Sequence, residues 1–274
     1  MPGVSPMPPR PSFQQILTEA VADLRAHGYD SKARLQKWVR ALRRAAEAAT
    51  GSPQLLESEI SRTLRKAYSQ QVTGGVLARR QGIPAYTVKK LSPALQRELS
   101  RRIQASADLI TLNRTQAIER TLQRFSGWAT AQNPGRVTPE KVREIKADIA
   151  KPVRSQPFEK RRVIIDQTAK LNSNINYLVA SDNKAIAVVW DANAGRPNYN
   201  HRKEHLARDG KIYVLRDGWA YRQGLITRGA GIYEDMDSFG ELPFCSCRGR
   251  YLYHLDQLPD DMLTEKARKA LAKP

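Results

Sequence analysis

Cysteines, aromatic residues and long apolar runs are scarce in this sequence. Only two of its 274 residues are cysteines, and aromatic side chains make up 7%. Two cysteines cannot build a disulfide framework, and in an extended chain the single residue between Cys245 and Cys247 would point them to opposite faces. No stretch approaches the roughly 18 uncharged apolar residues of a membrane-spanning helix. Residues 1–11 form a Pro-rich arm without the apolar core of a signal peptide. We therefore expect a reduced, soluble protein with no membrane segment.

Acidic residues are few relative to basic ones. The chain has 46 Lys and Arg against 27 Asp and Glu, a formal net charge of +19. Residues 1–156 hold 27 of the basic and 12 of the acidic side chains, so most of the excess lies there. Such a charge favours a polyanionic partner such as nucleic acid, or an acidic protein surface. A solvated helical surface rich in arginine has the same composition.

Apolar residues recur at helical spacing through residues 12–156. Ser12 and Gln15 form a capping-box pattern, and the pairs Ser52-Pro53, Ser92-Pro93 and Thr138-Pro139 are further helix starts. The stripe that follows residue 92 predicts one long helix. The sequence therefore predicts a basic, helical first part.

Residues 74–91 are the least regular stretch of the first part. They contain Arg79, Arg80, Lys89 and Lys90. We consider these four residues candidate nucleic-acid contacts on an extended loop, and an ordinary solvated connection is the alternative.

The pattern changes after the prolines at 152 and 157. A helix is expected over residues 158–180, followed by strands at 185–190 and 211–215 separated by a polar loop, and then by a Gly-rich irregular stretch. The predicted fold class is α+β, with a mainly helical N-terminal part followed by a small α+β module with long loops. The predicted divisions are the arm at 1–11, the helical part at 12–156, the module at 157–258 and a C-terminal helix at 259–274.

His201, His205, Cys245 and Cys247 are the one group of side chains that suits metal binding. Two imidazoles and two thiolates match tetrahedral zinc, although zinc knuckles use two residues between cysteines rather than one. One alternative is a pair of buried cysteines beside a packed histidine. Another is a nucleophilic cysteine activated by His205, for which the sequence supplies no third orienting group. We interpret the acidic residues of 234–237 as a solvated loop and predict no catalytic residue and no cofactor besides this possible zinc.

Three segments of the second part, with a tryptophan between the first two, occur in a recognisable order. The first segment, residues 166–172, reads Asp-Gln-Thr-Ala-Lys-Leu-Asn, and Trp190 then ends a predicted strand. The second segment, residues 202–213, contains Arg-x-x-His followed by Asp-Gly-Lys-Ile-Tyr. The third segment, residues 243–248, contains Cys-x-Cys. In this order and spacing, the stretch Arg161–Arg250 resembles the phage Mu protein F-like family, the minor head proteins of tailed bacteriophages. Residues 191–197 depart from the Asp-x-Arg-x-Arg pattern of that family, and His201 has no counterpart in it.

The resemblance implies a virion component that is not an enzyme. Such a protein would be a minor head protein or head–tail connector component, assembled in the host cytoplasm and placed at the portal vertex or inside the head. Its partners would be the portal protein, other head or neck proteins and packaged DNA. The apolar stripes of the first part also suit a homo-oligomeric ring, an inference from pattern rather than from the family. Two alternatives are a metal-dependent nucleic-acid enzyme or toxin-like effector built on the same module, and a free-standing DNA-binding protein.

Overall fold

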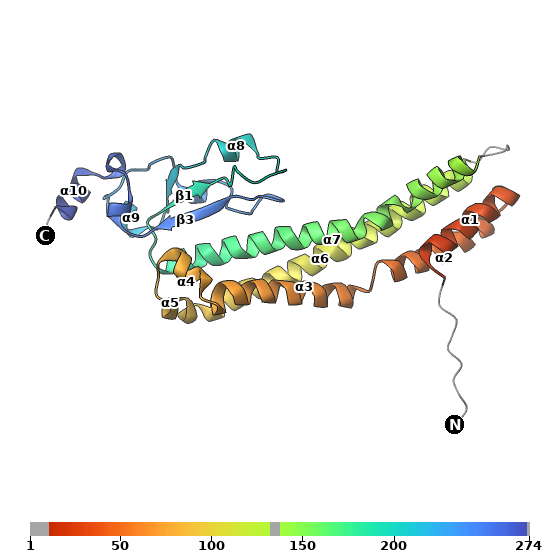
Figure 1. Ribbon diagram of the computed structural model, residues 1–274, viewed down its shortest axis with the longest axis horizontal. Coiled ribbons are helices and arrows are strands. Elements are labelled where there is room, and N and C mark those ends of the chain that lie inside the picture. The colour runs from red at the N-terminus through yellow and green to blue at the C-terminus, as the bar shows by residue number, and fades with distance from the viewer. Residues whose placement is uncertain (1–10, 132–137, 273–274) are drawn as a thin grey trace, which may run out of the picture. The chain divides into compact units, whose positions relative to one another are not determined.

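The computed structural model describes residues 11–131 and 138–272. The predicted Pro-rich arm lies outside these residues except for its last position. The described chain is mainly helical, with one small antiparallel sheet late in the sequence, which confirms the predicted fold class (Figure 1). Within the described residues, no helix combines the length and the apolar character needed to cross a membrane.

The chain forms two compact units, and each is built from two separate stretches. The first unit contains residues 1–59 and 107–163, and the second contains residues 60–106 and 164–274. The predicted boundary at residues 156 and 157 falls within a helix of the first unit. The helices that contribute residues to both units are α3 (Pro53–Tyr68), α6 (Ser92–Thr130) and α7 (Pro139–Asp182).

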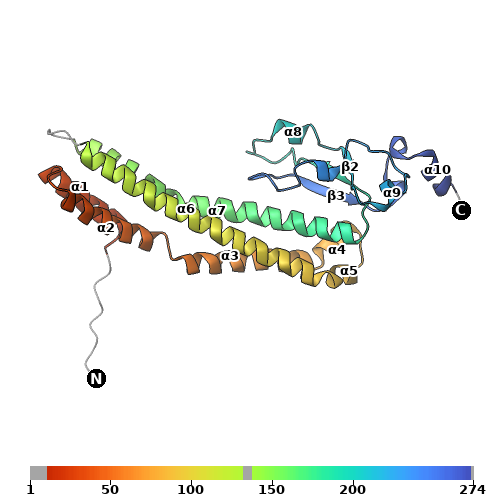
Figure 2. The same cartoon turned by 180° about the vertical axis from the view of Figure 1, so that it is seen from behind.

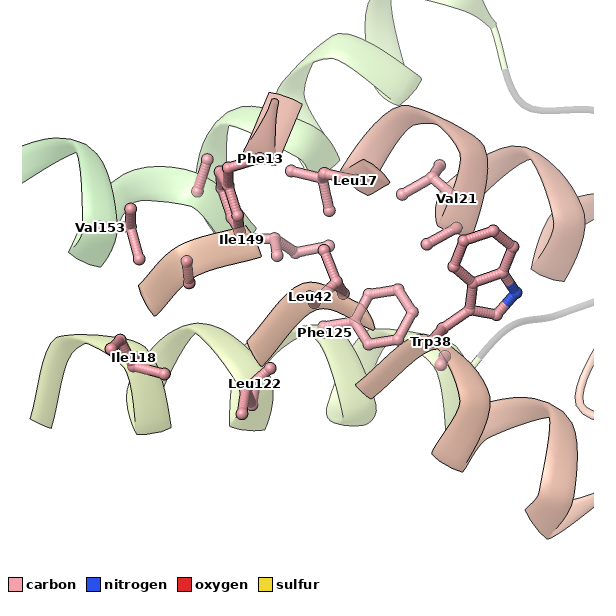
Figure 3. Packing of buried hydrophobic residues seen from close by; sticks show 14 of the residues in the cluster. Phe13, Leu17, Val21, Trp38, Leu42, Ile118, Leu122, Phe125, Ile149 and Val153 are labelled. Atoms are coloured by element: carbon pink, nitrogen blue, oxygen red, sulfur yellow. The ribbon is translucent and has the colours of Figure 1, made fainter. Parts of the chain in front are cut away.

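Helices α1 (Phe13–His27) and α2 (Lys32–Ala49) pack in the first unit with its portions of α6 and α7. Serine caps start both helices: the Ser12 side chain accepts a hydrogen bond from the Gln15 N–H in a full capping box, and Ser31 caps α2. Their apolar stripes meet in one core (Figure 3). Its fully buried members include Leu17, Leu24, Leu42, Phe125 and Ile149.

The two prolines of α7 do not interrupt the helix, so the predicted separate helix beginning near residue 158 is wrong. Because Pro152 has no N–H, the carbonyl oxygen of Asp148, four residues earlier, has no helical donor. Arg124 of α6 donates from Nη1 to this oxygen at 2.8 Å and to Asp148 Oδ1 at 2.6 Å. A side chain from the neighbouring helix thus replaces a backbone hydrogen bond, and the buried residues Ile149 and Val153 hold the segment in the core.

Residues 74–91 are helical rather than a loop, which corrects the prediction for this stretch. A π-helical turn at Ser69–Thr73 leads into α4 (Val76–Gln81) and α5 (Ala85–Lys90). Gly75 and Gly82 flank α4 with φ of 67° and 65°, a backbone conformation that glycine adopts without steric cost. The sequence signal was weak because each helix has fewer than two turns and no repeated apolar stripe.

The sheet has the strand order β2-β1-β3 and is antiparallel throughout. Figure 2 labels its two outer strands, β2 and β3. Its strands are β1 (Ala187–Asp191), β2 (Ile212–Val214) and β3 (Arg248–Leu252). Val188 pairs with Tyr213 and Tyr251, and these residues belong to the core on one face, which also contains both cysteines. Ala187 pairs with Val214 and Leu252, which belong to the second core. This alternation follows from the two-residue period of a strand.

Short elements connect these strands. They are α8 (Lys203–Leu206), α9 (Trp219–Arg222) and 3-10 turns at Tyr233–Asp235, Leu255–Gln257 and Asp260–Met262. The predicted C-terminal helix begins later than expected, as α10 (Glu265–Leu271), because the Thr264 side chain caps it by accepting a hydrogen bond from Ala267 N–H.

Candidate functional site

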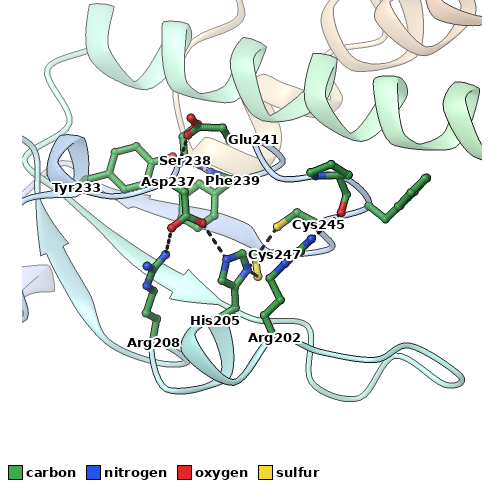
Figure 4. A network of polar contacts seen from close by, with 12 residues as sticks. Arg202, His205, Arg208, Tyr233, Asp237, Ser238, Phe239, Glu241, Cys245 and Cys247 are labelled. Atoms are coloured by element: carbon green, nitrogen blue, oxygen red, sulfur yellow. Dashed lines mark hydrogen bonds and ion pairs between the residues drawn. The ribbon is translucent and has the colours of Figure 1, made fainter. Parts of the chain in front are cut away.

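His205, Cys245 and Cys247 meet in a buried cluster on the Trp190 face of the sheet (Figure 4). His205 lies on α8, and the cysteines lie in the loop before β3. The Nδ1 atom of His205 is 3.3 Å from Cys247 Sγ and 3.6 Å from Cys245 Sγ. The exposed fractions are 3% for His205, 4% for Cys245 and 6% for Cys247. The prediction that His205 and the Cys-x-Cys element share one local cluster is confirmed.

The expectation that the two cysteine side chains point to opposite faces is wrong. It assumed a strand, but residues 245–247 are irregular and β3 begins only at Arg248. Phe244, with φ of 59°, turns the chain immediately before them. Both sulfur atoms therefore reach the same imidazole, and both cysteines are free thiols.

Asp237 contacts the imidazole from the side opposite the sulfur atoms. Its Oδ2 lies 2.8 Å from His205 Nε2, and its Oδ1 accepts a hydrogen bond of 2.9 Å from Arg208 Nη1. The Arg208 guanidinium also lies 4.8 Å from the centre of the Trp190 ring. Burial alone would raise the pKa of Asp237, but the hydrogen bond and charge of Arg208, with His205, lower it overall. The interpretation of Asp237 as part of a solvated loop is therefore wrong.

Three side chains hold the loop that carries the cysteines. Asp166 of α7 accepts a hydrogen bond of 2.6 Å from the Phe244 N–H and contacts Lys170 Nζ at 2.8 Å. Arg202 Nη2 donates to the Pro243 carbonyl at 2.9 Å, and Tyr199 donates its hydroxyl proton to the Phe244 carbonyl at 2.6 Å. The loop is thus fixed from α7 and from the segment before α8.

The two thiols have opposite electrostatic environments. A hydrogen bond from Cys247 lowers the pKa of the Cys245 thiol, although burial opposes the shift. The same contact, burial and a Cys245 thiolate raise the pKa of Cys247. The first proton therefore leaves the pair more easily than that of an isolated thiol, and the second leaves with difficulty, because two adjacent negative charges repel.

The donor set and its spacing fit a zinc ion. With zinc–sulfur and zinc–nitrogen bonds of about 2.3 and 2.0 Å at tetrahedral angles, bound sulfur and nitrogen atoms lie about 3.5 Å apart. The two His205-to-cysteine distances bracket this value. The contact of His205 with Asp237 on its other nitrogen is the usual carboxylate support of a ligating histidine. Zinc here would need deprotonated thiols and would join α8 to the cysteine loop.

His201 does not join this group of ligands. The atoms that lie within 4.8 Å of one another belong to His205, Cys245 and Cys247. The His201 ring packs instead against Tyr199, with ring centroids 4.5 Å apart. The cluster therefore offers three protein ligands rather than the four predicted, with a fourth position left for water or another group.

The basic residues singled out in the sequence lie on α4 and α5 and are exposed. They are Arg79, Arg80, Lys89 and Lys90. Arg80 lines a pocket together with both cysteines, whereas the other three are not among its lining residues.

Asp237 and Arg208 are the members of the site that sequence reasoning missed. Their signal is weak because Asp237 follows two other acidic residues in a polar loop and its partners lie 29 and 32 residues earlier. No protein-family model, curated protein or solved structure matches this chain, so its function is inferred from the geometry of this cluster and from the sequence resemblance.

Proposed function

We propose that this chain is a structural protein of a tailed bacteriophage virion, a minor head or head–tail connector component at the portal vertex, close to packaged DNA. One observation carries the proposal: the segments that resemble the Mu protein F-like family converge on the cysteine loop. Asp166 and Arg202 hold the loop by its backbone, and His205 contacts both of its sulfur atoms. Residues from these separate segments thus act together to hold the cysteine loop in place.

Burial of the cluster favours a structural centre over a catalytic one. His205 and both cysteines are more than nine-tenths buried, as ligands of closed structural zinc sites are, whereas a set of three protein ligands is by itself the pattern of catalytic zinc. Zinc at this site would supply folding free energy, since its ligands come from segments 40 residues apart. The residues of the module would then present a rigid docking surface for head or neck proteins.

The first part of the chain supplies the proposed contact with DNA and with other copies. Residues 1–156 carry 27 basic and 12 acidic side chains, a charge that favours phosphates without reading bases. Leu55 and Leu112 are large apolar side chains of this part with exposed fractions above one half. Contacts between subunits of a homo-oligomeric ring would remove them from water.

The test is to mix purified full-length chain with the portal protein of the same phage, and to analyse the mixture by size-exclusion chromatography and electron microscopy. We expect an oligomer that elutes with the portal and adds ordered density to it. A monomer that does not bind portal but hydrolyses nucleic acid would contradict the proposal.

The second candidate is a metal-dependent nucleic-acid enzyme or toxin-like effector on the same module. The three-ligand set His205, Cys245 and Cys247 favours it, because a catalytic zinc ion has three protein ligands and a fourth position for water. Nuclease activity that chelation or Cys247→Ser abolishes would support this candidate. Activity unchanged by both would show that it comes from elsewhere.

A further inference from the structure

A pocket of about 300 Å³ opens beside the two cysteines in the second unit. Side chains from α4, α7, the loop after β1, the cysteine loop and β3 line it. Two kinds of lining residue indicate a ligand. Some carry a buried polar atom that has no hydrogen-bond partner in the described chain, and others are arginines that form no ion pair with a carboxylate of the described chain. They are Asn172, Ser246, Tyr251, Arg80, Arg196 and Arg248.

Three polar atoms of the lining are buried without a hydrogen-bond partner in the described chain. They are Oδ1 of Asn172, the hydroxyl of Ser246 and the hydroxyl of Tyr251. Ser246 and Tyr251 have exposed fractions of 8% and 7%. Buried polar groups are almost always hydrogen-bonded, so three unsatisfied atoms on side chains that line one pocket favour a polar occupant toward which these side chains turn. Burial raises the pKa of Tyr251, which keeps its hydroxyl a donor at neutral pH.

Arginines give the pocket a positive charge, of which a Cys245 thiolate would offset one unit. Among the described residues that line it there are three arginines and no aspartate or glutamate. All three arginines are exposed, and none of them occurs in an ion pair with a carboxylate of the described chain; Arg196 lies 4.9 Å from the centre of the Tyr199 ring. Guanidinium groups bind phosphate through paired hydrogen bonds, so an anionic group completes this set.

We propose that this pocket binds a small phosphorylated ligand that also carries a hydrogen-bond donor, either a free nucleoside monophosphate or the terminal nucleotide of a nucleic-acid strand. The three exposed arginines would contact the phosphate oxygens, and the hydroxyls of Ser246 and Tyr251 would reach them after a movement of their side chains. Asn172 Oδ1 would accept a hydrogen bond from an N–H or O–H group of the base or the sugar. The volume lies at the small end of ligand pockets. This inference goes beyond the proposed structural role and does not depend on it.

The experiment is calorimetric titration of the full-length chain with adenosine monophosphate, adenosine and inorganic phosphate in separate runs. The variants are Arg196→Gln, Arg248→Gln and Tyr251→Phe. The matched control is Arg222→Gln, which removes the same charge from an exposed arginine of α9 outside this pocket. Thermal unfolding of each variant by circular dichroism verifies that it is folded.

We expect adenosine monophosphate to bind more tightly than adenosine or inorganic phosphate. Each of the two pocket arginine variants should weaken it by about tenfold, and the control should change it by less than about twofold. Displacement of the nucleotide by an oligonucleotide with a 5′-phosphate would identify strand ends as the source, and failure to displace it would identify free nucleotide. No binding at about 10 mM ligand, equal affinity for inorganic phosphate, or an equal effect of the control would overturn the proposal.

Discussion

Asp166 joins α7 to the cysteine loop, and replacing it tests whether this contact determines the geometry of the His–Cys cluster. Its carboxylate accepts the Phe244 N–H at 2.6 Å and pairs with Lys170 at 2.8 Å. The side chains of Lys170 and Asp166 are only 12% and 8% exposed, so solvent screens this pair weakly.

Asp166→Ala removes both interactions from a buried position. A hydrogen bond to a charged group contributes about 1.5–3 kcal/mol, and removing one partner of a buried ion pair costs about 3–5 kcal/mol. The two costs overlap, so we expect the free energy of unfolding to fall by about 3–5 kcal/mol. Asp166→Asn retains an acceptor for the Phe244 N–H and should cost about 1–3 kcal/mol.

Urea unfolding followed by circular dichroism measures the free energy of unfolding. The rate at which the thiols react with a chromogenic disulfide measures how accessible the two cysteines of the loop are. Because Cys245 and Cys247 are the only cysteines, the thiol signal reports on the cluster alone. A chelator is present throughout, so that bound metal does not protect the thiols. We expect slow reaction in the native chain and faster reaction in Asp166→Ala.

The control is Asp182→Ala, which replaces an exposed aspartate on the same helix. It should alter the free energy of unfolding by less than about 0.5 kcal/mol. If Asp166→Ala behaves like this control in both assays, the contact between α7 and the loop does not fix the cluster.

Three further predictions concern metal, pH and packing. When zinc is added to protein from which a chelator has removed metal, one equivalent should bind and the melting temperature should rise, and Cys247→Ser should abolish both effects. Zinc binding that is unchanged in this variant would show that the cluster is not the zinc site. Hydrogen bonds from Trp38 and Arg34 lower the pKa of the Asp23 carboxyl below its ordinary value of 3.8, although burial opposes the shift. The charged Asp23 therefore stabilises the folded protein fully above pH 3.8, and this stabilisation is lost as the pH falls through the lower pKa of the folded state. Asp23→Asn should therefore flatten the acid limb of stability against pH, and an unchanged limb would refute this assignment. Gly249→Ala would place a Cβ 2.5 Å from a ring carbon of Phe239, and should cost about 1–3 kcal/mol in urea unfolding; native-like stability would show that the ring can move.

Local signals in the sequence were sufficient to predict most of the helices. Ser12 and Ser52 stand where the backbone N–H groups of a helix start need acceptors, and these positions match the observed starts of α1 and α3. The prolines of α7 misled the prediction because their effect depends on a neighbour. Arg124, 24 residues before Asp148, donates to the carbonyl that Pro152 leaves without a helical donor.

Long-range partners explain what the sequence did not reveal about the module. Strand β3 begins Arg-Gly-Arg, with no apolar alternation, and exists through its register with β1. The grouping of His205 with the cysteines was predicted from residue chemistry and the resemblance. The role of Asp237 was not, since an aspartate that contacts a distant histidine has no pattern in its own segment.

The interleaved composition of the two compact units has a consequence for synthesis on the ribosome. All residues of the first unit have been made once residue 163 is added, whereas the second unit still lacks its entire sheet at that point. Residues 60–106 therefore cannot complete their unit until the strands have been synthesised, whereas all residues of the first unit are already present. Cutting the chain at any single position removes residues from at least one unit, so conventional truncation at a linker will not separate them. A rearranged gene that joins residues 60–106 to 164–274 through a new connection is the design that could release the second unit intact.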